Sequence, residues 1–162
     1  MTVEPRRVVV TVGASGALQL ALWALIGPGD EVLLTDPGYP CNRHFVQLAG
    51  GLPVDLPVGP ATNWQPTVAQ IEAALTPRTR AVLLASPANP TGAVIDRAEL
   101  ARIATLLRER DVALIADEIY HGLIYEADTC TALACDADAV VVNSFSKYFG
   151  MTGWRLGWLV VP

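Results

Sequence analysis

The chain has 162 residues, with 11 basic and 16 acidic side chains and a formal net charge of −5. This acidic balance argues against a nucleic-acid-binding protein, which would present a basic face. Because 52% of the residues are apolar and only 17% are charged, an intrinsically disordered chain is excluded as well. The longest apolar stretch, residues 17–26, is about half of what a membrane span requires, so we expect no membrane association.

Apolar runs alternate with amphipathic stretches along the chain, and no linker or repeat interrupts them. This alternation predicts an α/β fold with a mostly parallel seven-stranded sheet and helices on both faces, in one domain over residues 1–162. In chain order, the expected elements are a strand over 7–12, a helix over 14–25, strands over 32–35 and 53–58 with a helix over 42–49 between them, a helix over 67–75, a strand over 81–85, a helix over 97–110 capped by Asp96, and strands over 112–116, 139–142 and 156–161.

The three cysteines are an odd number, and Cys130 and Cys135 have no His or second Cys pair at a spacing typical of zinc ligands. The N-terminus lacks the apolar segment of a signal peptide. We therefore expect a cytoplasmic protein with reduced thiols and no metal site.

In folds of this class, ligands bind beyond the carboxyl ends of the strands. The residues that follow the apolar runs are therefore expected to converge on one edge of the sheet. They are small, polar or aromatic: Gly13, Ala14, Ser15, Tyr39, Asn89, Asp117, Tyr120, Ser144 and Lys147.

Lys147 is the only lysine among the 11 basic residues, and the other ten are arginines. A lysine that directly follows a buried strand can be partly desolvated, which makes its amine nucleophilic toward carbonyl groups. The alternative is a solvated surface lysine. Since arginine stays protonated and cannot form an imine, the single exception in an arginine-only chain favours the chemical interpretation.

Asp117, Asn89 and Tyr120 each allow two interpretations. Asp117 follows a buried strand and is either the partner of a protonated ring nitrogen or an ordinary loop or capping carboxylate. Asn89, in the sequence Asn-Pro-Thr-Gly, is either a turn residue or an amide donor to a ligand oxygen. Tyr120 either offers its hydroxyl to the same ligand or packs as an aromatic side chain.

The segment 13–16, with the sequence Gly-Ala-Ser-Gly, opens a predicted helix. Its free N–H groups suit a phosphate, although small residues also begin helices for packing reasons. Neither a dinucleotide fingerprint nor a Walker loop is present. Arg155 and Ser144 are candidates for the same phosphate, and a surface salt bridge is the alternative for Arg155.

Taken together, these groups describe one ligand. It carries an aldehyde for the lysine, a basic ring nitrogen for the carboxylate, a ring oxygen for the amide and hydroxyl, and a phosphate for the helix N-terminus. Pyridoxal 5'-phosphate has this combination, and a carboxylate next to its ring nitrogen tunes it as an electron sink.

Three segments, 85–92 (ASPANPTG), 116–120 (ADEIY) and 144–158 (SFSKYFGMTGWRLGW), resemble in content, order and spacing the class I/II aminotransferases of the aspartate aminotransferase family. The resemblance extends from about residue 8 to the end of the chain. It implies a pyridoxal-phosphate-dependent enzyme of fold type I. The roles that it implies are an internal aldimine and proton shuttle for Lys147, the ring nitrogen for Asp117, the ring hydroxyl for Asn89 and Tyr120, ring stacking for Tyr39, and the phosphate for Gly13, Ala14, Ser15, Ser144 and Arg155.

The resemblance also implies the reaction and the assembly. The expected activity is transfer of an amino group between an amino acid and a 2-oxo acid, by a homodimer. Members of that family are more than twice as long, so we expect this chain to be the large domain without the N- and C-terminal parts of the small domain. The alternatives are a pyridoxal-phosphate-binding module without turnover, another fold type I enzyme such as a carbon–sulfur lyase, and a structural remnant.

Overall fold

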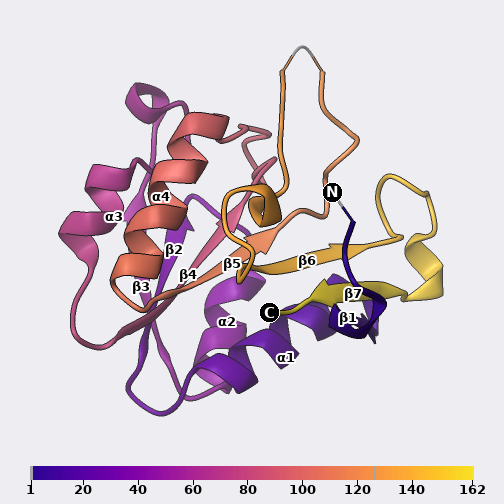
Figure 1. The fold of residues 1–162 in the computed structure, drawn as a ribbon, viewed down its shortest axis with the longest axis horizontal. Helices are drawn as coiled ribbons and strands as arrows, with labels where there is room; N and C mark the ends of the chain where they lie inside the picture. The colour runs from indigo at the N-terminus through magenta and orange to yellow at the C-terminus, as the bar shows by residue number, and fades with distance from the viewer. Residues whose placement is uncertain (1, 126) are drawn as a thin grey trace.

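A computed structural model describes residues 2–125 and 127–162. The predicted strands and helices are all present in the predicted order (Figure 1). They are β1 (Val8–Thr11), α1 (Gly13–Leu25), β2 (Glu31–Asp36), α2 (Cys41–Leu48), β3 (Leu52–Pro57), α3 (Val68–Ala74), β4 (Thr79–Ala85), α4 (Arg97–Glu109), β5 (Ala113–Asp117), β6 (Val140–Ser144) and β7 (Gly157–Val160). Short 3₁₀ turns lie at Pro5–Arg7, Pro60–Thr62, Ala132–Ala134 and Thr152–Trp154.

The strands form a single sheet in the order β1-β7-β6-β5-β4-β2-β3. The five strands from β6 to β3 are parallel, whereas β7 runs antiparallel to both of its neighbours. This confirms the prediction of a seven-stranded, mostly parallel sheet. The strand order reverses between β2 and β4, and a reversal of this kind opens a crevice for ligands at the carboxyl ends of the strands.

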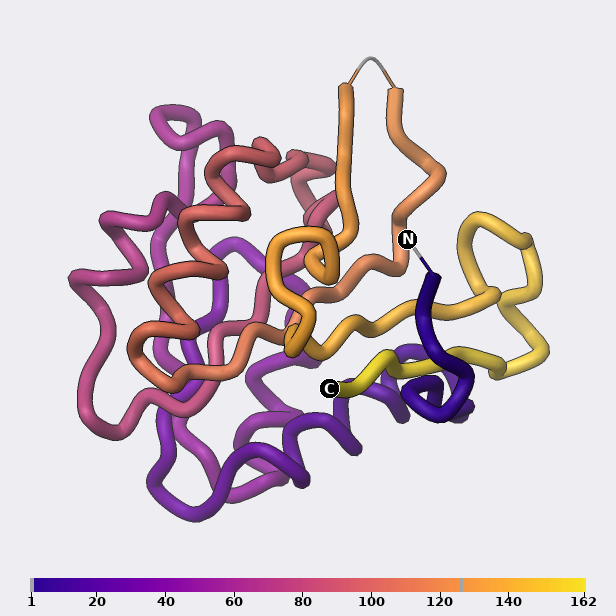
Figure 2. Tube along the Cα trace, viewed as in Figure 1, coloured from indigo at the N-terminus to yellow at the C-terminus, as the bar shows by residue number. Residues whose placement is uncertain are grey.

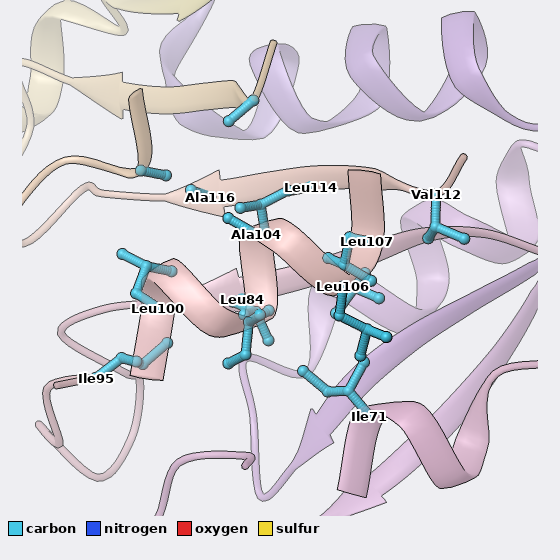
Figure 3. Packing of buried hydrophobic residues seen from close by; sticks show 14 of the residues in the cluster. Ile71, Leu84, Ile95, Leu100, Ala104, Leu106, Leu107, Val112, Leu114 and Ala116 are labelled. Atoms are coloured by element: carbon cyan, nitrogen blue, oxygen red, sulfur yellow. The ribbon is translucent and has the colours of Figure 1, made fainter. Parts of the chain in front are cut away.

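Both faces of the sheet are covered by helices, which is why the strands are apolar almost without interruption. On one face, α3 and α4 pack over a core that includes Leu33, Leu84 and Leu107. Figure 3 shows side chains of α4, among them Leu107, meeting Leu84 and Leu114 of the sheet. On the other face, α1 and α2 pack over a second core. The fully buried residues of that core include Leu22, Val32, Val46 and Ile115.

The main differences from the predicted elements lie at strand ends. Asp117 was expected just beyond the fifth strand but is its last residue, and its backbone is in register with Ala85 of β4. Ser144 likewise ends β6 and is in register with Gly157 of β7. The hydrogen-bonded ladder continues past the apolar residues because backbone pairing does not depend on side-chain polarity. Two candidate site residues are therefore held by the sheet rather than by loops.

The helix starts follow local chemistry. The Asp96 side chain accepts hydrogen bonds from the backbone N–H groups of Ala98 and Glu99 and caps α4, as predicted. Thr67 and Gln70 form a capping box at the start of α3. Among the described residues, no helix is both long enough and apolar enough to cross a bilayer.

Candidate active site

The candidate residues lie at the edge of the sheet where β2, β4, β5 and β6 end. Asp117 and Ser144 are the last residues of their strands, and Tyr39 and Asn89 follow β2 and β4 within four residues. Because β7 is antiparallel, its first residue lies at this same edge, which brings Arg155 to it as well. These residues were expected from the sequence to converge on one edge of the sheet, and the strand topology brings them there.

Asp117 is a buried carboxylate that lacks an opposite charge. Its Oδ1 accepts a hydrogen bond of 3.1 Å from the backbone N–H of Ile119. No ion pair involves this carboxylate in the described part of the chain. Burial raises its pKa from 3.8 to about 6, although the Ile119 hydrogen bond acts in the opposite direction. A cationic ligand group would remove this cost, since buried carboxylates are stable when they are paired.

Lys147 lies beside Tyr120. Its Nζ is 5.4 Å from the centroid of the Tyr120 ring, a distance typical of a cation–π contact. The lysine side chain is exposed, so the expected partial desolvation is wrong for this chain as it stands. The reason is its position in an open turn between β6 and the 3₁₀ turn at Thr152–Trp154, where no described element covers it.

Tyr39 and Asn89 border this group from two sides. A hydrogen bond with Cys41 and then burial raise the pKa of Tyr39, and Asp117 and Tyr120 raise it further through their charges, so the three groups lie within electrostatic reach. Asn89 and Tyr120 line a pocket of about 430 Å³ formed by the loops after β4 and β5. Tyr39, at the end of β2, lines a separate, smaller pocket of about 150 Å³.

The start of α1 forms a second group with Arg155. Its N-cap residue, Val12, has no side chain that could accept a hydrogen bond, so the first N–H groups of α1 remain available. Arg155 packs so closely on Gly13 that a Cβ added there would lie 2.5 Å from its Nη2. Gly13 also has a φ of +69°, which glycine adopts without strain. Free N–H groups beside a guanidinium form a site suited to a dianion.

Ser146 connects the two groups; it lies in the segment 144–147 expected at this edge, although the sequence alone assigned it no role. Its Oγ lies 3.5 Å from Nη1 of Arg155, and its backbone N–H donates to Ser144 Oγ at 3.1 Å. Lys147, the next residue, reaches Tyr120. The sequence signal that could have found Ser146 is its position two residues after Ser144, within the segment 144–158 that carries the family resemblance. Ser15 lies at the same helix start.

Gly157 was also missed, and it determines how closely β7 approaches α1. A Cβ on this residue would lie 2.6 Å from the Gly13 carbonyl carbon, 2.9 Å from the Ala14 nitrogen and 2.9 Å from the Asn143 oxygen. All three are backbone atoms and cannot move aside independently. The close contact holds the start of α1 against the end of the sheet.

Gly157→Ala is therefore expected to lower the free energy of unfolding by about 1–3 kcal/mol through overpacking, as urea titration would measure. The matched control is Gly153→Ala, because nothing lies within 4 Å of a Cβ at that position. Equal stability of the two variants would contradict the close packing of β7 against α1.

Comparison with known proteins places this geometry in a family. The family model "Aminotransferase class I and II" matches residues 1–162. The valine–pyruvate aminotransferase of Mycobacterium tuberculosis is 52% identical over 164 residues, which cover 100% of this chain and 42% of that protein. The probable aspartate/prephenate aminotransferase of Thermus aquaticus is 37% identical over 163 residues, which cover 100% of this chain and 43% of that protein.

Solved structures agree with the sequence comparison. An aminotransferase from Mycobacterium tuberculosis superposes with a TM-score of 0.96 at 51% identity, covering 100% of this chain and 42% of that one. The aspartate aminotransferase of Thermus thermophilus with maleate superposes with a TM-score of 0.97 at 37% identity, covering 100% and 43%. The chain thus spans less than half of the length of these relatives. Both its sequence and its fold show that the chain belongs to the class I and II aminotransferase family.

Proposed function

We propose that this chain is the cofactor-binding large domain, over residues 1–162, of a pyridoxal-phosphate-dependent aminotransferase. Its substrates would be an amino acid and a 2-oxo acid. The observation that carries the proposal is the buried Asp117 carboxylate, which forms no ion pair among the described residues and ends a strand at the same sheet edge as Tyr39 and Asn89. The homodimer implied by the family resemblance and the cytoplasmic location expected with reduced thiols belong to the same proposal.

The donor set fits pyridoxal phosphate group by group. Asp117 would pair with the protonated ring nitrogen, and Asn89 and Tyr120 would hold the ring hydroxyl. Tyr39 would lie against the ring. The phosphate would be bound by the start of α1 (Gly13, Ala14 and Ser15) together with Ser144 and Arg155, where free N–H groups and a guanidinium already lie side by side.

Pyridoxal phosphate supplies an aldehyde that condenses with amines and a cationic ring that withdraws electrons. The residues of this chain would divide the remaining work. Asp117 would stay ionised next to a cation, which keeps a proton on the ring nitrogen. Lys147 Nζ would hold the aldehyde before the substrate arrives, and would then accept the substrate α-proton and return it. Arg155 would fix the distance between the phosphate and Lys147.

The proposal is tested by adding pyridoxal phosphate to the folded chain and recording its visible absorbance. Valine, alanine or aspartate is then added, and the 2-oxo acid is measured by mass spectrometry. An aminotransferase core converts the bound cofactor to its aminated form and releases one equivalent of 2-oxo acid. If the chain binds the cofactor but releases no 2-oxo acid, the result would support the alternative of a binding module without turnover. Ammonia and a 2-oxo acid from cystathionine would indicate a carbon–sulfur lyase. A folded chain that takes up no cofactor would contradict the proposal.

A further inference from the structure

Glu118 is a second buried carboxylate, adjacent to Asp117 and outside the cofactor-binding set described above. It is 5% exposed. Its Oε1 accepts a hydrogen bond of 2.7 Å from the backbone N–H of Ala132, fourteen residues further along the chain. Its Oε2 lies 3.2 Å from Nδ1 of His121. One side chain therefore contacts both ends of a single connection.

The described parts of the connection that Glu118 closes, residues 118–125 and 127–131, project away from the sheet (Figure 2). Figure 2 shows the chain leaving after β5 and returning before the 3₁₀ turn at Ala132–Ala134. The returning end is anchored, because Ala132 and Leu133 are buried in the core beneath α4. The outgoing end, residues 118–123, is held to it through the Glu118 carboxylate. Glu118 thus acts as a clamp at the base of the projection.

The outgoing end carries Tyr120. It is a tight turn in which the N–H of His121 donates to the Glu118 carbonyl and the N–H of Leu123 donates to the Tyr120 carbonyl. Gly122, with a φ of +87°, lies so close to Tyr148 that a Cβ added to it would be 2.5 Å from the Tyr148 ring. The turn therefore packs directly on the residue that follows Lys147. Any shift of this turn changes the position of Tyr120 relative to the lysine amine.

The Glu118 carboxylate and the His121 imidazole are in contact at the base of the connection. Burial raises the pKa of Glu118 to about 7 and lowers the pKa of His121. The His121 Nε2 is buried and has no hydrogen-bond partner among the described residues. A neutral imidazole with its proton on Nδ1 places this nitrogen 3.2 Å from the carboxylate and avoids burying an unpaired N–H at Nε2. The imidazole therefore packs against the carboxylate.

We propose that Glu118 is a positioning residue that acts through Tyr120: by joining His121 to the Thr131–Ala132 backbone, it fixes the turn that holds the Tyr120 phenol beside Lys147. The expected effect on cofactor binding rests on the proposed function. The role of Glu118 in fixing the turn does not. It predicts that removing the Glu118 carboxylate loosens the turn. The cofactor would then lose its contact with Tyr120, as it would if the Tyr120 hydroxyl were removed.

The test is a double-mutant cycle on the full chain with pyridoxal phosphate as the probe. Glu118→Leu and Tyr120→Phe are each expected to weaken the Kd about tenfold, the equivalent of one lost hydrogen bond. Because both remove the same contact, the double variant should remain about tenfold weaker instead of a hundredfold. Glu118→Gln keeps an acceptor for Ala132 and should restore the affinity to near that of the unmodified chain. Losses that multiply in the double variant would overturn the proposal.

A second readout needs no cofactor. Amide hydrogen exchange at His121, Leu123 and Ala132 should be at least about tenfold faster in Glu118→Leu. Glu72→Leu is the control, since Glu72 is an exposed residue on α3 that pairs with Arg110 at 2.8 Å. If the unmodified chain binds no pyridoxal phosphate, the proposed function fails, but unchanged exchange in Glu118→Leu would refute the clamp independently. Should Glu118→Leu not fold, His121→Phe, which removes only the contact between the imidazole and the carboxylate, takes its place in both measurements.

Discussion

Replacing Lys147 with arginine is expected to abolish covalent attachment of pyridoxal phosphate to the side chains of this protein. Arginine keeps the positive charge and the contact with the Tyr120 ring, but it stays protonated and forms no imine. Borohydride reduction followed by peptide mass spectrometry should locate the phosphopyridoxyl group on Lys147 in the unmodified chain and nowhere but the N-terminal amine in the variant. Amino transfer, where the unmodified chain shows it, should slow by about 10²–10⁴-fold, the range of a lost general acid–base group.

The composition of the chain supplies the control for this experiment. Lys147 is its only lysine, so no other side-chain amine competes for the label. Noncovalent uptake should persist in Lys147→Arg, since the phosphate and ring contacts come from other residues. Labelling confined to the N-terminus in the unmodified chain would contradict the assignment of Lys147, even if the protein binds the cofactor.

Replacing Asp117 with asparagine is expected to stabilise the cofactor-free chain while weakening cofactor binding. Burial raises the pKa of Asp117 from 3.8 to about 6, so the folded state binds this proton more tightly than the unfolded state. The stabilisation from Asp117 is therefore complete below pH 3.8 and is lost as the pH rises through about 6. At pH 8 the ionised carboxylate costs about 2–3 kcal/mol, and asparagine avoids this cost while its Oδ1 still accepts from Ile119.

Urea unfolding at a series of pH values measures this effect. The unmodified chain should lose stability between about pH 4 and pH 7, and Asp117→Asn should lose less. Part of the decline should remain in the variant, because Glu118 still titrates with a pKa raised to about 7. Asp128→Asn, at an exposed position, serves as the control.

The Kd for pyridoxal phosphate should weaken about 10- to 100-fold in Asp117→Asn, since a charged hydrogen bond is lost. A less stable Asp117→Asn at pH 8 would contradict an unpaired buried carboxylate.

These opposite effects on stability and binding have one cause. Above its pKa, the buried Asp117 carboxylate has no cationic partner among the described residues, and the proposed cofactor would supply one. Strain of this kind is expected where a residue is selected for function at the expense of stability. It also explains why Asp117 differs from Glu31, another buried carboxylate, whose pKa is lowered by hydrogen bonds from Thr76 and Arg78.

Much of the fold could be predicted from the sequence because its strands are buried on both faces. Continuous apolar runs separated by amphipathic stretches leave few arrangements other than a parallel sheet between two helical layers. The ends of the strands could not be predicted to the residue. Asp117 and Ser144 extend their strands because Ala85 and Gly157 on neighbouring strands pair with them.

The sequence by itself determined the residue types of the site: one lysine, a carboxylate after a buried strand, and small residues at the start of a helix. Local spacing carries that information, since each type follows its own apolar run. The antiparallel course of β7, the contact of Arg155 with Gly13 and the clamp made by Glu118 were decided only by the tertiary structure. Each joins residues distant in sequence, from 14 between Glu118 and Ala132 to 144 between Gly157 and Gly13, and so depends on packing that no local pattern encodes.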